Sequence, residues 1–93
     1  MIVSLLNFKV TKVGEAHSAQ VTAVAGATGG NETFAFDIVG EQVSKSEQFN
    51  PNDVKDIVVT HHQNVRGVVS VTASPSGMSR NCFLDCSAAS DQC

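Results

Sequence analysis

The residues with the clearest capacity for chemistry are three cysteines at the C-terminal end of the chain. Cys82, Cys86 and Cys93 lie within the last twelve residues, and the first eighty-one residues contain none. Such thiols can form a disulfide, bind a metal ion or act as nucleophiles. Because three cysteines allow at most one disulfide within the chain, one thiol is left for a partner chain or for reactivity.

The spacing of these cysteines limits how they can pair. In a strand, Cys82 and Cys86 would lie about 13 Å apart, so only a turn or a helix makes them neighbours. Cys86 with Cys93 would close a small loop, and Cys82 with Cys93 a larger one. All three remain disulfide candidates. A disulfide in an oxidising environment is favoured, because it would anchor a segment that has little core of its own.

Histidines extend the set of possible metal ligands. His61 and His62 are adjacent, and neighbours on a strand point to opposite faces, so they bind one metal ion together only at a turn. With Cys82 and Cys86 they could form a mixed site, but the cysteine spacing lacks the paired Cys-x2-Cys units of zinc sites. We therefore expect ordinary strand-end histidines, no metal and no cofactor.

Catalytic motifs are missing from the sequence. It contains no Gly-x-Ser-x-Gly elbow, no Gly-rich phosphate loop followed by Lys and Ser or Thr, and no His-Glu-x-x-His. We therefore expect no enzymatic activity. Asn31-Glu32-Thr33 matches the acceptor pattern for N-glycosylation, which matters only in a glycosylating secretory pathway, so Asn31 is a candidate modification site.

Composition narrows the possible partners. The formal net charge is -3, and the six basic residues are scattered, whereas nucleic-acid binding needs clustered Lys and Arg. No segment reaches the length of a membrane span, and the apolar start has no basic residue before it, unlike a signal peptide. We expect protein partners, including self-association, and neither nucleic acid nor a membrane span.

The elements that must carry these residues are strands, because apolar and polar residues alternate with period two. Strands are expected over 6–10, 19–25, 33–38, 54–60 and 65–73, with Leu6, Phe8 and Val10 on one face of the first. The last two resemble a hairpin, with a turn at 63–64 or 66–67. Loops are expected over 26–31 and over most of 40–53, with room for a short strand near Val43. Only a short turn after Asp85 favours helix.

This pattern predicts an all-β fold: a small antiparallel β-sandwich of about six or seven strands, with an immunoglobulin-like architecture. A small β-barrel is the alternative. The likeness is architectural only, since the intersheet Cys and Trp pattern is absent. We expect one β domain over residues 1–77 and a C-terminal cysteine tail over 78–93, packed on the domain or extending from it.

A low-charge surface rich in Ser, Thr and Asn suits contacts made by edge strands and loops. The favoured function is a non-enzymatic structural or assembly module, such as a subunit of a virion, filament or surface layer. The alternatives are a secreted ligand-binding or adhesion domain and a carrier of a modified Cys/Ser-rich C-terminal peptide. An extracellular or virion-associated location is favoured over the cytoplasm.

Overall fold

The computed structural model describes residues 2–14, 16–38, 40–61, 67–84 and 90–93. These residues form strands without any helix. The eight strands are β1 (Val3–Val13), β2 (Ala16–Ala25), β3 (Gly30–Ile38), β4 (Glu41–Phe49), β5 (Val54–His61), β6 (Gly67–Ser74), β7 (Ser79–Leu84) and β8 (Ser90–Gln92).

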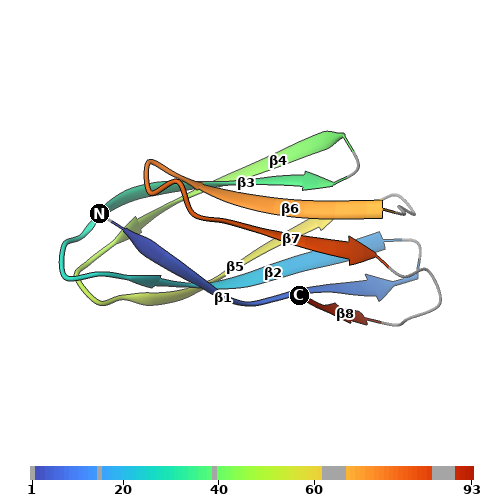
Figure 1. Cartoon of the computed structure of the whole chain (residues 1–93), viewed down its shortest axis with the longest axis horizontal. Helices are drawn as coiled ribbons and strands as arrows, with labels where there is room; N and C mark the ends of the chain where they lie inside the picture. The colour runs from blue at the N-terminus through green and yellow to red at the C-terminus, as the bar shows by residue number, and fades with distance from the viewer. Residues whose placement is uncertain (1, 15, 39, 62–66, 85–89) are drawn as a thin grey trace.

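The strands form two four-stranded antiparallel sheets (Figure 1). The first sheet has the order β5-β2-β1-β8 and the second has the order β4-β3-β6-β7. All strand pairs are antiparallel. The prediction of an antiparallel all-β fold is therefore confirmed.

The core lies between the sheets and follows from the alternation in the sequence. In β2 and β3 every second side chain is buried, because the pleat points successive side chains to opposite faces. Aromatic contacts join the sheets and strands: the Phe8 and Phe36 ring centroids are 6.4 Å apart, and those of Phe34 and Phe49 are 5.9 Å apart. These four phenylalanines are the largest fully buried side chains.

A bulge in β1 overturns the prediction that Leu6 shares a face with Phe8 and Val10. The register with β2 shifts between Leu6 and Lys9, and Asn7 adopts a φ of 53°. The inserted residue reverses the alternation, so Leu6 is 43% exposed on the outer face. Phe8 and Val10 are buried as predicted.

The segment predicted to be mostly connection is instead a nine-residue strand, β4. The prediction was wrong because β4 is an edge strand with charged residues at alternate positions, and only Phe49 among its residues is buried. The preceding loop is shorter than expected, since Gly30 already belongs to β3. Gly29 must lack a side chain, because a Cβ there would collide with the Phe49 carbonyl oxygen.

The predicted hairpin of the segments 54–60 and 65–73 is also wrong. β5 pairs with β2 in the first sheet, whereas β6 pairs with β3 and β7 in the second. The proposed turn at 63–64 or 66–67 includes residues outside the described ranges. Alternation identified both strands, but it carries no information about which strand lies beside which.

The C-terminal segment contributes a strand to each sheet. β7 pairs with β6, and β8 pairs with residues Lys9 to Thr11 of β1. The sequence does not show these strands as clearly, because β7 is short and β8 has only three residues. The turn predicted after Asp85 lies outside the described residues.

Candidate functional site

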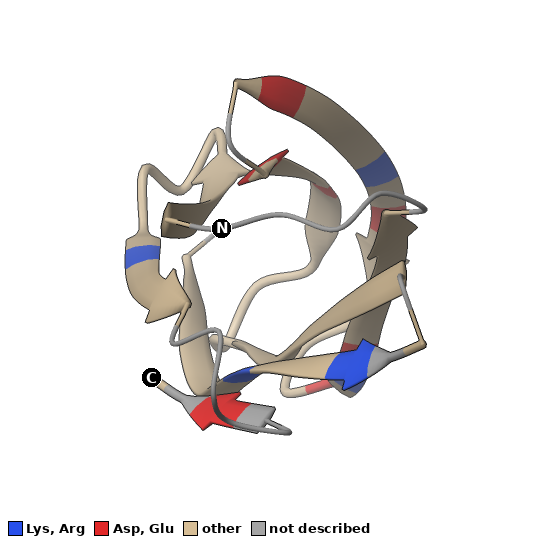
Figure 2. Ribbon diagram, turned by 90° about the vertical axis from the view of Figure 1, so that its right-hand side faces the viewer, with Lys and Arg blue, Asp and Glu red and all other residues tan. Residues whose placement is uncertain are grey.

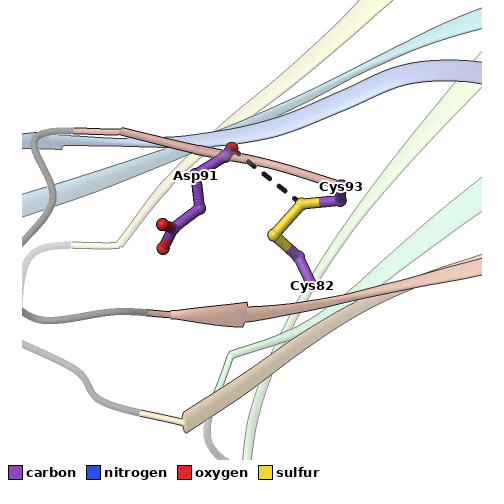
Figure 3. The surroundings of a disulfide bond; sticks show 3 residues. All are labelled: Cys82, Asp91 and Cys93. Carbon is purple, nitrogen blue, oxygen red and sulfur yellow. Dashed lines mark hydrogen bonds between the residues drawn. A yellow bond between two sulfur atoms is a disulfide. The ribbon is translucent and has the colours of Figure 1, made fainter.

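The edge strands of the two sheets lie beside each other in two places, β7 with β8 and β4 with β5. We call these the β7–β8 seam and the β4–β5 seam. The β7–β8 seam contains the disulfide. Cys82 is buried on β7, and Cys93 follows β8, so their bond joins the second sheet to the first (Figure 3). Their Cα atoms are 5.1 Å apart, and the Cys93 amide donates a hydrogen bond to the Phe8 carbonyl at 2.8 Å. Of the three candidate cysteines, Cys86 lies outside the described residues.

At the opposite end of this seam, a buried carboxylate organises the turn between β6 and β7. The Ser76 amide donates to Oε1 of Glu32 at 2.7 Å, and the Val3 amide donates to the Ser76 hydroxyl at 3.2 Å. Glu32 is 1% exposed. The three residues therefore connect β3 of the second sheet with the start of β1 in the first.

Sequence reasoning missed Glu32 as a core residue. Its position is in phase with Phe34, Phe36 and Ile38 on the inner face of β3, and this alternation was the available signal. Within the described part of the chain, its Oε2 atom is buried without a hydrogen-bond partner. A buried carboxyl oxygen without a hydrogen bond lowers the stability of the fold. The favourable contribution of Glu32 is the hydrogen bond by which it holds the turn at Ser76.

The β4–β5 seam is closed by lysine side chains. The Lys55 ammonium donates to the Gln48 carbonyl at 2.7 Å and lies 3.7 Å from the Glu47 carboxylate. The Lys45 ammonium donates to the Val58 carbonyl at 3.4 Å. The two ammonium groups therefore hydrogen-bond to backbone carbonyls of the edge strands β4 and β5. Without these contacts, the carbonyls could pair with a strand of another chain.

The same seam includes one of the predicted metal-ligand candidates. His61 is 5% exposed, and its Nε2 lies 2.5 Å from Oε2 of Glu41 at the start of β4. His17 of β2 is opposite His61 in the register and is also buried. His61 therefore joins β5 to β4 as a hydrogen-bonding residue, while His62 lies outside the described residues.

The described residues hold no group of three or more His, Cys, Asp or Glu side chains that could bind a metal ion. His61 contacts Glu41, whereas Cys82 is bonded to Cys93, so these two candidates have different partners. Asn31, the glycosylation candidate, is exposed at the start of β3.

The outer face of the first sheet gathers apolar side chains from three strands. We call this surface the apolar face and define it by Leu6, Val24, Val54 and Val58. Val54 is 63% exposed, Leu6 43% and Val58 39%, while Val24 is half-buried opposite Val54 in the register. Adjacent and diagonal neighbours on one sheet face lie close enough for their side chains to interact.

Two opposite charges lie on the apolar face. Lys9 of β1 and Asp56 of β5 are separated by β2, because Lys9 is opposite Gln20 and Asp56 is opposite Thr22. The Thr22 hydroxyl donates to Oδ1 of Asp56 at 2.8 Å. The described strands of this face thus present four apolar side chains, with Ser4, Gln20 and Thr22 beside them, and one charge of each sign.

The outer face of the second sheet has a different composition. Its exposed apolar side chains are Val68 at 51% and Phe83 at 71%, which are opposite each other in the register. The rest of its described positions are mainly Ser, Thr, Asn and Gln, and Thr33 and Ser46 are hydrogen-bonded at 3.0 Å. Figure 2 shows long stretches of ribbon without charged residues. Val68 and Phe83 thus form a small exposed apolar pair on a mainly polar face.

The chain has no match among protein-family models, curated proteins or solved structures. In the part of the chain that the structure describes, no helix has the length and apolarity needed to cross a membrane.

Proposed function

We propose that this chain is a non-enzymatic structural or assembly module that binds other protein subunits, as in a virion, a filament or a surface layer. The observation that supports this proposal most directly is the apolar face. Its side chains come from β1, β2 and β5 and remain outside the core. A grouped set of exposed apolar side chains favours a protein contact more than scattered ones do.

The contacts in the seams favour the face over the β-edges as the binding surface. Lys45 and Lys55 already bind backbone carbonyls of β5 and β4, and the disulfide holds β8 beside β7. An incoming strand would have to displace these groups. Contact through a sheet face needs no such rearrangement.

The disulfide also supports an extracellular or virion-associated location, because disulfides persist in oxidising environments. It favours assembly over the carrier hypothesis as well. The described part of the Cys-containing segment is held by β7, β8 and the Cys82–Cys93 bond, whereas a modifying enzyme needs an accessible peptide.

Size fractionation of the material in which the chain is naturally produced tests this function. We expect the chain to sediment in a complex much larger than its 9.8 kDa mass, and Val54→Ser to shift it toward the free chain. Val68→Ser is the matched control, because this valine is similarly exposed on the other face. Recovery of the unaltered chain as free monomer throughout would contradict the proposal.

A further inference from the structure

We propose that a second copy of this chain covers the apolar face, related to the first by a twofold axis that exchanges Lys9 and Asp56. This inference rests on the proposed assembly function, for which it names the partner and the surface. Two properties of the face support it, its net charge and the positions of its two charged residues, and its area sets the strength of the contact.

The charges on the apolar face balance. The chain has nine acidic and six basic residues, so two copies repel each other over most approaches. The described strands of the face carry Lys9 and Asp56, whose charges cancel. Two copies can therefore meet here without bringing like net charges together.

The two charges of the apolar face are placed so that a symmetric contact can pair them. Lys9 and Asp56 are on β1 and β5, the strands on either side of β2, and in adjacent rows of the register. A twofold axis in the plane of contact, perpendicular to the line that joins them, sets each Lys9 opposite the other copy's Asp56. One symmetric contact thus forms two opposite-charge pairs, as an isologous interface requires.

The contact area is small. β1, β2 and β5 are 11, 10 and 8 residues long, so at a spacing of about 4.8 Å they present roughly 450 Å² on one face. Two copies would bury roughly 900 Å² together, which is in the range of weak, transient contacts. We therefore expect a weak, reversible dimer, which suits a subunit whose stable assembly depends on several contacts at once.

Sedimentation equilibrium of the purified, oxidised chain tests the partner. We expect a monomer–dimer equilibrium at micromolar to millimolar concentration, and Val54→Ser should weaken the dimer about tenfold. Val68→Ser should leave the dimer constant unchanged. Circular dichroism and the mass of the disulfide-bonded chain check that each variant is folded.

Charge reversal tests the geometry. Lys9→Asp alone places acidic residues opposite each other twice, and Asp56→Lys alone does the same with basic residues, so each should weaken the dimer about tenfold or more. A mixture of the two variants should form heterodimers at wild-type strength, because both pairs are then of opposite charge. Each chain in the mixture still carries its own reversed charge. Recovery of the dimer therefore requires that residue 9 of one copy contacts residue 56 of the other.

The outcomes separate this inference from the function on which it rests. A dimer that Val54→Ser weakens but that the mixed variants fail to restore would overturn the twofold geometry. A purified chain that stays monomeric at all concentrations would overturn the second copy as partner. If that monomeric chain still enters a large complex in native material, the assembly function stands and its partner is a different protein.

Discussion

The β4–β5 seam and the β7–β8 seam join the same two sheets with different chemistry. In the first, Lys45, Lys55 and His61 bind carbonyl and carboxylate oxygens across the seam. In the second, Cys82 and Cys93 are covalently bonded. Charged side-chain contacts at a surface are individually weak and are screened by salt, whereas a disulfide restricts the unfolded chain and responds to reductant.

This difference shows how the link between the sheets depends on the length of the edge strands. β4 and β5 are long strands, so many small polar contacts can be distributed along them. β8 has three residues and forms few backbone hydrogen bonds. The Cys82–Cys93 disulfide next to it therefore contributes more to holding β8 in place than side-chain contacts could.

Removal of the disulfide should have the largest effect. Cys82→Ser, or reduction of the wild-type chain, should lower the free energy of unfolding by about 3 kcal/mol, because the bond closes a loop between residues 11 apart in sequence. Denaturant unfolding with and without reductant measures this. Cys86→Ser retains both bonded cysteines and should keep the response to reductant. A wild-type midpoint that reductant leaves unchanged would contradict the role of this bond.

Glu32→Ala should affect the β7–β8 seam almost as strongly, with a loss of about 2 kcal/mol. It leaves the Ser76 amide without its carboxylate acceptor and creates a void beside the core. Glu32→Gln retains an acceptor and most of the volume, so it should cost less. Equal destabilisation by both variants, measured by denaturant unfolding, would contradict the role of the hydrogen bond to Ser76.

Glu41→Gln should weaken the β4–β5 seam by about 0.5 to 1 kcal/mol, because it removes the carboxylate that contacts His61. Exposure of the Glu41 side chain limits the effect. The difference from wild type should shrink at high salt, in contrast to the effect of the disulfide, since salt screens exposed charges. Unfolding experiments at low and high salt check this, and a salt-independent loss would argue against an electrostatic contact.

Lys55→Met should change stability least, by less than about 0.5 kcal/mol, because it keeps an apolar side chain of similar length and removes only an ammonium on a partly exposed side chain, which lies 5.4 Å from the centroid of the Phe49 ring. It frees the Gln48 carbonyl on an edge strand, so we expect increased aggregation in light scattering at high concentration. Lys12→Met, at an exposed position, is the matched control for lost charge. Equal aggregation of both variants would remove the case for an edge-protecting lysine.

Much of the fold could be predicted from the sequence, because alternation is a local property. The strands around Val21 and Phe36 follow directly from side chains that point to opposite faces. β4 could not be found in this way, because its inward positions carry charges whose partners lie on β5. The bulge at Asn7 was equally hidden, since one inserted residue changes the face of Leu6 without changing its type.

The candidate sites were less predictable than the strands, because they depend on contacts between distant segments. Three disulfide pairings were open from spacing alone, and the position of β8 beside β7 selects Cys82 with Cys93. The apolar face was not foreseen at all. Leu6 and Val54 are far apart in the sequence and come together only because β1 and β5 both flank β2.

The amino-acid sequence by itself determined the antiparallel β class, the low charge and the limit of one internal disulfide. Composition and period-two alternation are sufficient for these properties, because each depends on residue counts or immediate neighbours. Only the tertiary structure decided the strand order, the buried position of Glu32 and the grouping of Val24 with Val54. Such properties follow from how distant strands pack, and local alternation does not distinguish among the possible pairings.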